Sequence, residues 1–179
     1  MWIGRRGVAT ALALAQACVF FAGAASAQEV RLLAGDTSPL GWPYSAFTDA
    51  VVDAAGRLVF SGNSSGIFGR NGGAITQRVG AGDVLGDGRR IAGVSPPALT
   101  ADGCVVVRAT FAQGGEALVR ACGTSRLVLL DTTAEAPGGG AIRAFDTRLF
   151  AAGGDVVAAT ATLNDGTSVL LRIDGGGLT

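Results

Sequence analysis

The sequence contains no histidine and no lysine, so all 14 of its basic residues are arginine. Without histidine, the commonest general base near neutral pH is missing. Without lysine, neither a Schiff base nor a P-loop can be completed. The 14 acidic residues balance the arginines, so the charge gives no sign of a nucleic-acid or anionic-lipid partner. We therefore expect no cofactor and no nucleic-acid partner.

Aromatic residues are scarce, at 6% of the chain, whereas glycine accounts for 29 of the 179 residues. No long segment of the mature chain shows a helical pattern of apolar residues. High glycine together with many valines, leucines and alanines favours short strands joined by tight turns. The length suits one domain rather than two. These features predict an all-β fold.

The first 27 residues have the pattern of a cleaved secretory signal. Arg5 and Arg6 precede an apolar run over 7–21, and Ala25-Ser26-Ala27 supplies the small residues of a cleavage site. We expect the mature domain to cover residues 28–179, beginning at Gln28. The protein is then exported to the periplasm, the cell surface or the medium.

Two other interpretations of this segment are a membrane anchor and a lipidated cysteine. Gln16 interrupts the apolar run, which falls short of the roughly 20 apolar residues needed to span a bilayer. Cleavage before Cys18 would leave the most apolar residues, Val19-Phe20-Phe21, on the mature chain. Both interpretations are less favourable than cleavage, so we expect no stable membrane span after the signal is removed.

The two cysteines that remain after cleavage, Cys104 and Cys122, bracket a predicted β-hairpin. Its strands are 104–111 and 116–122, and Ala112-Gln113-Gly114 forms the turn, with glycine in the left-handed position. This register places Cys104 opposite Cys122, at a Cα separation that a disulfide accepts. An exported chain meets an oxidising compartment. We therefore predict a Cys104–Cys122 disulfide, although a slip of one residue would put the two side chains on opposite faces.

A repeat of 47 to 52 residues runs through the mature chain. It contains a strand ending in aspartate, an apolar strand after a glycine turn, and a strand closing on arginine. The anchors are Asp36, Asp83 and Asp131, then Gly56, Gly103 and Gly154, and then Arg70, Arg120 and Arg172. A further strand lies between the first two anchors of each repeat, at 47–52, 91–99 and 142–150. We place the repeats at roughly 31–73, 74–123 and 124–175.

Four-stranded antiparallel units with this period are typical of β-propeller blades. The sequence thus predicts an all-β chain of about three blade-like repeats forming a partial β-propeller, open or truncated. Propellers usually close with about four to eight blades, so three leave strand edges open. We expect self-association through these edges. The last residues, 175–179, match 72–76, where a further repeat would begin.

The repeat resembles that of exported bacterial tandem-repeat proteins with a β-propeller-like fold. The resemblance is carried by Ala55-Gly56-Arg57-Leu58-Val59-Phe60 followed by Gly66-Ile67-Phe68, and it covers nearly all of 31–179. It implies export and often a C-terminal anchor, and it implies no catalytic residue. The chain differs from the pattern where Asp53, Thr100 and Ala151 replace an expected asparagine, and no apolar tail follows Gly175.

Several local patterns suggest chemistry but have simpler explanations. The segment Gly62-Asn63-Ser64-Ser65-Gly66 matches a nucleophile elbow, yet it lies between two strands and has no histidine to act as base. Gly138-Gly139-Gly140 lacks the helix that a phosphate cradle needs. Calcium at Asp83–Asp87 would lack a full set of oxygen ligands, and zinc would have only two cysteines and carboxylates. We expect turns here, and no metal.

The recurring carboxylates Asp36, Asp83 and Asp131 are the remaining catalytic candidates, because glycoside hydrolysis needs only an acid and a second carboxylate. Recurrence in every repeat favours turn-capping instead, and the same holds for the recurring arginines. We therefore predict an exported, non-catalytic domain that binds or scaffolds an unknown ligand or protein. The alternatives are a fragment of a carbohydrate-active propeller enzyme that uses aspartates, and a truncated product with no independent function.

Overall fold

The computed structural model describes residues 34–63, 65–70, 74–151, 156–174 and 177–179. These residues form strands and turns without any helix, which confirms the predicted all-β class. It follows that none of them belongs to a helix able to cross a membrane. The predicted signal segment, 1–27, lies outside the described residues.

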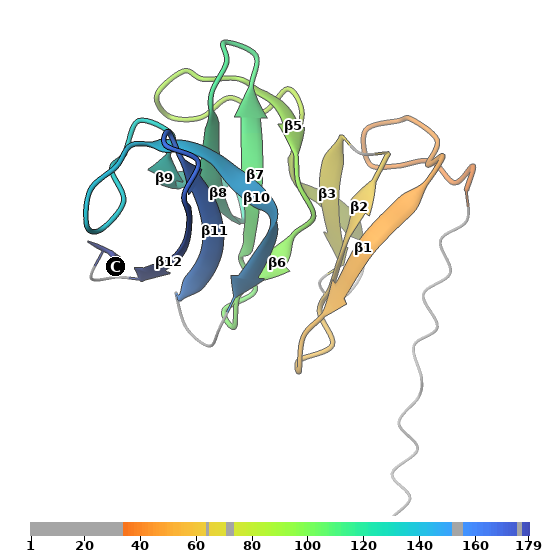
Figure 1. The fold of residues 1–179 in the computed structure, drawn as a ribbon. Helices are drawn as coiled ribbons and strands as arrows, with labels where there is room; N and C mark the ends of the chain where they lie inside the picture. Colours follow the sequence, from red (N-terminus) through yellow and green to blue (C-terminus); the bar gives the residue numbers. More distant parts are fainter. Residues whose placement is uncertain (1–33, 64, 71–73, 152–155, 175–176) are drawn as a thin grey trace, which may run out of the picture. The chain divides into compact units, whose positions relative to one another are not determined.

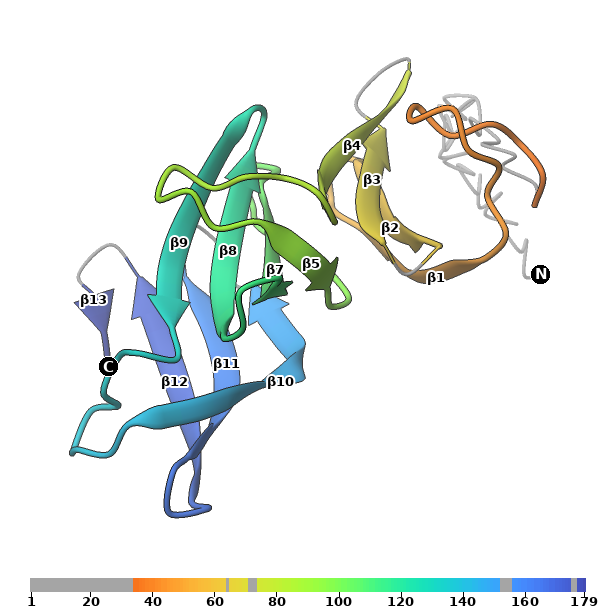
Figure 2. The ribbon, with the colours of Figure 1, turned by 90° about the horizontal axis from the view of Figure 1, so that it is seen from above.

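The strands form three antiparallel sheets (Figures 1 and 2). The first contains β1 (Phe47–Val52), β2 (Leu58–Gly62), β3 (Gly66–Arg70) and β4 (Ile75–Gly80). The second contains β5 (Ile91–Val94), β6 (Ala98–Leu99), β7 (Val105–Phe111), β8 (Glu116–Cys122) and β9 (Ser125–Asp131). The third contains β10 (Ile142–Ala151), β11 (Val157–Leu163), β12 (Ser168–Asp174) and β13 (Gly177–Leu178).

The sheets are offset from the predicted repeats. Strand β4 opens the repeat at 74–123 but pairs with β3, and β9 opens the repeat at 124–175 but pairs with β8. Only two residues separate Cys122 from Ser125, so β8 and β9 close as a tight hairpin. The first strand of a sequence repeat therefore completes the preceding sheet.

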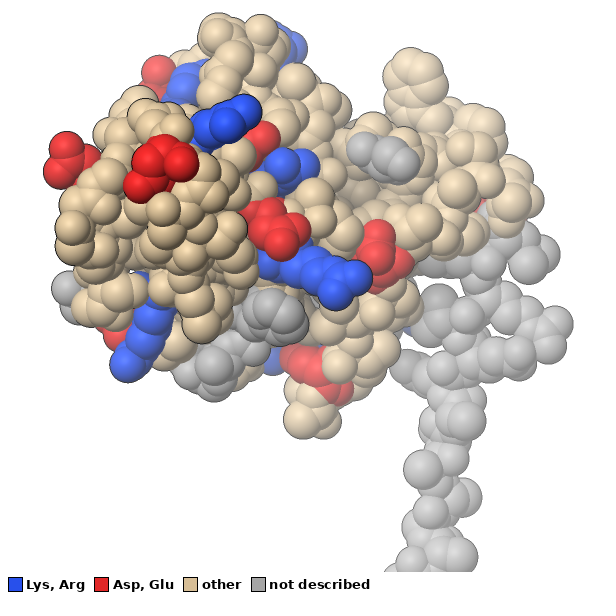
Figure 3. Space-filling view, viewed as in Figure 1, with Lys and Arg blue, Asp and Glu red and all other residues tan. Residues whose placement is uncertain are grey.

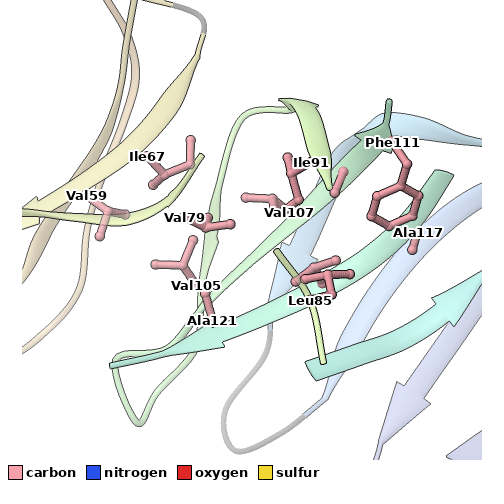
Figure 4. Close-up of a cluster of buried hydrophobic side chains, with 12 residues drawn as sticks. Val59, Ile67, Val79, Leu85, Ile91, Val105, Val107, Phe111, Ala117 and Ala121 are labelled. Carbon is pink, nitrogen blue, oxygen red and sulfur yellow. The ribbon is translucent and has the colours of Figure 1, made fainter. Parts of the chain in front are cut away.

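The predicted hairpin is formed by β7 and β8. Val107 lies opposite Val119 and Arg108 opposite Leu118, in the predicted register. The turn is closed by a hydrogen bond from the Phe111 N–H to the Gly115 carbonyl, at 3.2 Å. One face of the hairpin is wholly apolar and lies in the core shared with the first sheet (Figure 4): Val105, Val107, Ala109, Phe111, Ala117, Val119 and Ala121.

The second sheet is buried on both faces. Toward the first sheet it packs against Val59, Ile67 and Val79 (Figure 4). On its other face, Val106 and Leu118 are fully buried against the third sheet. The described core clusters join the first sheet to the second and the second to the third, and none joins the third to the first. The series of sheets is therefore open.

The other face of the first sheet carries an aromatic cluster. Tyr44, Phe60 and Phe68 are buried there, with Phe47 packed against them. The Tyr44 and Phe68 rings meet edge to face, with centroids 5.2 Å apart. The Tyr44 hydroxyl is buried and has no hydrogen-bond partner among the described residues.

Candidate functional site

Cys104 and Cys122 form the predicted disulfide, with Cα atoms 4.6 Å apart. The carboxylate of Asp102 lies 3.2 Å from the Cys104 sulfur and pairs with Arg120. Asp102, Cys104 and Cys122 are the one set of three metal-ligand types that converge within the described ranges. Because the two sulfurs are bonded to each other, they are not thiolates that could hold a metal.

Two of the recurring aspartates, Asp83 and Asp131, cap turns and face arginines. Asp131 accepts a hydrogen bond from the Thr133 N–H at 2.9 Å and lies 3.4 Å from Arg89. The Thr133 hydrogen bonds, followed by the Arg89 charge, lower the pKa of Asp131. Asp83 lies 3.2 Å from Arg126. Each carboxylate is thus balanced by its own guanidinium rather than placed opposite a second carboxylate.

At the suggested calcium site, Asp83–Asp87, the carboxylates are likewise paired with arginines. Asp87 lies 2.7 Å from Arg89 and also accepts the Arg89 backbone N–H at 3.0 Å. These contacts lower the pKa of Asp87. With Asp83 paired to Arg126, the two carboxylates do not present a joint oxygen site. Acidic and basic side chains are likewise interspersed on the face shown in Figure 3.

The recurring arginines and the elbow-like segment also have structural roles. Arg120 pairs with Asp102, and Arg172 lies 2.9 Å from Asp174 with much of its side chain in solvent. Gly62 pairs with Gly66 across the β2–β3 hairpin, so the segment is a turn between strands, as predicted. Its central serine, Ser64, lies outside the described residues.

A tight loop recurs ahead of the first strand of each sheet. Its ends meet in the isolated bridges Thr37–Pro43, Val84–Arg90 and Glu135–Ala141. The same two backbone hydrogen bonds close all three loops; in the first they join Ser38 to Trp42 and Gly41 to Ser38. The residue after each bridge is buried in all three cases: Tyr44, Ile91 and Ile142. The three loops can therefore be compared position by position.

In the second and third loops, the residue equivalent to Trp42 packs against the sheet. In the second loop it is Arg89, whose guanidinium carbon lies 4.4 Å from the centroid of the Phe111 ring. In the third it is Gly140, packed so tightly that a Cβ there would lie 2.9 Å from Leu163. Both loops thus cover a large side chain at the end of a strand.

At the strand end near the first loop the corresponding residue is a glycine. Phe111 pairs with Ile91 and Leu163 with Ile142, which directly follow the bridge residues of their loops. Gly62 holds the corresponding place at the end of β2, and it pairs with Phe47, four residues after the bridge residue Pro43. Any larger residue at 62 would collide with Phe68 and Tyr44, since a Cβ would lie 2.9 and 3.0 Å from their rings.

A hollow of about 390 Å³ lies beside the first loop. We call it the Trp42 hollow; it is lined by Ser38, Leu40, Trp42, Asn63, Ser65, Phe68 and Ala81. Trp42 is 67% exposed and Leu40 is 50% exposed, whereas Phe68 is buried. The volume lies within the range of about 300–1,000 Å³ that is common for small-molecule sites.

Asn63 fixes the wall of this hollow. Its side-chain oxygen accepts hydrogen bonds from the Ser45 N–H at 2.7 Å and the Ser45 hydroxyl at 2.9 Å. Its side-chain nitrogen donates to the Pro43 carbonyl at 3.0 Å. The backbone of Asn63 has φ 56°, a left-handed conformation that asparagine tolerates. The amide is therefore held rigidly, and its second N–H hydrogen is left to donate elsewhere.

A second, smaller hollow of about 100 Å³ is lined by Thr48, Asp49, Ser61, Gly66, Val94 and Pro96. Asp49 is its one carboxylate and lies at a β-bulge with φ 52°. Glycoside hydrolysis needs a second carboxylate several ångströms away. The described residues that line this hollow and the Trp42 hollow include no such pair.

Sequence reasoning identified these loops as turns and missed the Trp42 hollow. The available signal was the departure of one repeat from the others: Leu40 and Trp42 in the first loop, against aspartate, arginine and glycine at the same positions later. This departure could be interpreted only by comparing Gly62 with Phe111, two residues that are distant in sequence and are aligned through strand pairing. Comparisons with family models, curated proteins and solved structures find no match to this chain, so its function must be argued from its own residues.

Proposed function

We propose that this protein is an exported, non-catalytic β-repeat domain that binds a ligand in the Trp42 hollow. One observation carries the proposal: the same loop occurs three times, is closed twice, and is open once. Singly exposed apolar residues are common on proteins. Here Leu40 and Trp42 are exposed side by side around a hollow of about 390 Å³, where the other repeats place an ion pair or glycine.

Export is supported by the signal-like pattern of residues 1–27 and by the disulfide, which persists in oxidising compartments. We also propose that the three sheets are blades of an open, propeller-like array. The support is that each sheet is antiparallel, carries the same leading loop, and packs face to face on the next. We further propose that the chain belongs to the exported tandem-repeat proteins that its sequence repeat resembles.

A binding role is favoured over the carbohydrate-active enzyme because of the carboxylates. Asp83 and Asp131 are each engaged by an arginine. The described side chains that line the Trp42 hollow are all neutral. It therefore offers surfaces and hydrogen bonds to a ligand, but no group able to exchange protons near neutral pH.

Screening by NMR tests the binding role. The full-length sequence is expressed with export, and a mixed library of neutral sugars, short peptides and nucleotides is added to the purified protein. We expect shifts confined to the Trp42 indole N–H and the Asn63 side-chain amide, with ligands recovered unchanged. Ligands that shift signals only elsewhere, or a ligand that is converted, would contradict the proposal. Intact mass of the exported protein tests cleavage before Gln28.

A further inference from the structure

We infer that the ligand of the Trp42 hollow is a neutral saccharide, whose ring stacks on the Trp42 indole. This inference rests on the proposed binding function and adds its chemical class. Three observations carry it: the charge of the lining, the exposure of its apolar side chains, and the placement of its polar groups.

The charge of the lining argues against ionic ligands. Among the described residues that form the Trp42 hollow, none is ionisable near neutral pH. In the equivalent second loop, the same two positions are an aspartate and an arginine that pair with each other. A phosphate, a carboxylate or an amine would lose hydration here without gaining an opposite charge. The hollow thus suits a ligand without net charge.

The exposure of the apolar residues argues against a fully apolar ligand. Trp42 is 67% exposed and Leu40 is 50% exposed, so a ligand could be covered from one side only. An apolar molecule would keep the rest of its surface in water, where it gains nothing. A pyranose ring suits such one-sided contact, since one face carries C–H groups while its hydroxyls stay hydrated. The indole face, with its negative quadrupole, attracts C–H groups of this kind.

The polar groups provide the hydrogen bonds that sugar hydroxyls require. Ser38 accepts the backbone N–H groups of Leu40 and Trp42 at 3.3 and 3.4 Å, which orients its hydroxyl hydrogen away from them. Ser65 is exposed at the edge of the hollow. Asn63 is rigid and keeps one N–H available. Hydroxyls both donate and accept, so two serines and an amide match a polyol better than a ligand with acceptors alone.

The test uses neutral hexasaccharides of glucose, mannose, xylose and N-acetylglucosamine. An oligogalacturonate serves as the charged comparison and a polyproline peptide as the non-sugar comparison. Binding is measured by calorimetry and by the Trp42 indole signal on the full-length protein expressed with export. The variants are Trp42→Ala, Trp42→Leu and, as a matched control, Leu127→Ala, which removes another exposed apolar side chain from β9.

We expect at least one neutral hexasaccharide to bind, and both Trp42 variants to weaken that binding by about tenfold or more. Trp42→Leu keeps an apolar side chain, so its loss of affinity isolates the stacking contribution. Leu127→Ala should bind as the parent protein does. Thermal unfolding of each variant separates a binding defect from a folding defect.

The contrary outcomes distinguish this inference from the binding role itself. Binding of the peptide or the charged oligomer at Trp42, without any neutral saccharide, would overturn the saccharide class and leave the site in place. No binding of any probe, together with an indole signal that depends on protein concentration, would indicate contact between copies and overturn both proposals. Equal saccharide binding by Trp42→Ala would also overturn the inference.

Discussion

The Arg89 guanidinium lies over the Phe111 ring, with its central carbon 4.4 Å from the ring centroid. The same guanidinium pairs with the carboxylates of Asp87 and Asp131. A single side chain therefore joins the second loop to two strands of its sheet, β7 and β9. This contact is what the first repeat lacks, because Gly62 stands where Phe111 stands. The second loop thus packs arginine on phenylalanine, where the first repeat has tryptophan and glycine at the same two positions.

Replacing Arg89 with alanine should destabilise the protein by about 1 kcal/mol, since it removes a cation–π contact and two partly exposed ion pairs. Urea unfolding at neutral pH measures this change. Arg90→Ala is the matched control, because the Arg90 side chain is exposed and its hydrogen bond to Gln113 is donated by the backbone N–H. Equal unfolding midpoints for Arg89→Ala and the parent would show that the contact contributes nothing.

The disulfide should contribute about 3 kcal/mol to the free energy of unfolding, because it closes a loop of 18 residues in the unfolded chain. The double variant Cys104→Ser, Cys122→Ser measures this by chemical denaturation. Thiol titration of the denatured exported protein, without reductant, should find neither thiol of the pair reactive. Two reactive thiols at these positions would contradict the bond.

The Tyr44→Phe variant should be as stable as the parent or more stable by up to about 1 kcal/mol. The Tyr44 hydroxyl is buried without a partner among the residues that the structure describes, and leaving such a group unsatisfied costs free energy in the folded state. Thermal unfolding at neutral pH gives the comparison, with Phe68→Leu as a control that perturbs the same cluster by packing. A clear loss of stability in Tyr44→Phe would indicate that the hydroxyl has a partner.

Tyr44 also predicts instability in alkali. Burial raises the pKa of the Tyr44 phenol above its ordinary value. Near and above about pH 10 the unfolded chain ionises while the folded chain stays protonated, so stability falls as pH rises. Tyr44 is the sole tyrosine, so tyrosinate absorbance reports this one group. The chain has no lysine, the other side chain whose ordinary pKa lies near 10. Tyr44→Phe should remove this alkaline loss, and persistence of the loss would assign it to another cause.

Self-association is expected at the third sheet. Strand β13 pairs with β12 at Ile173 and Asp174, Thr179 exchanges backbone hydrogen bonds with Arg172, and Leu170, farther along β12, is 74% exposed. Unpaired strand edges and exposed apolar side chains promote contact between copies. Light scattering should show a mass that rises with concentration, and Leu170→Arg should reduce it more than Val84→Arg, a change in an exposed loop. A monomer that is insensitive to dilution would contradict this expectation.

Much of the local structure could be predicted from the sequence. The β7–β8 register follows from alternation and a glycine turn, both local features, so the disulfide followed as well. The burial of Val106 and Leu118 could not be predicted, since alternation shows which residues share a face but not whether another sheet covers it. The Trp42 hollow combines residues of the first loop, the β2–β3 turn, β3 and the segment after β4. Those relations are tertiary and leave no mark on spacing.

The second sheet, buried on both sides, affects how the chain unfolds. Repeat proteins often lose their units one at a time, because each unit contacts only its neighbours. Here the middle sheet contributes to both of the cores that lie between sheets, so removing it exposes Val59 and Ile67 on one side and Leu171 and Ile173 on the other. Without it, neither outer sheet has another sheet to pack against, and the first keeps only its aromatic cluster. Loss of the middle sheet should therefore destabilise both outer sheets, and we expect the three sheets to melt in a single cooperative transition.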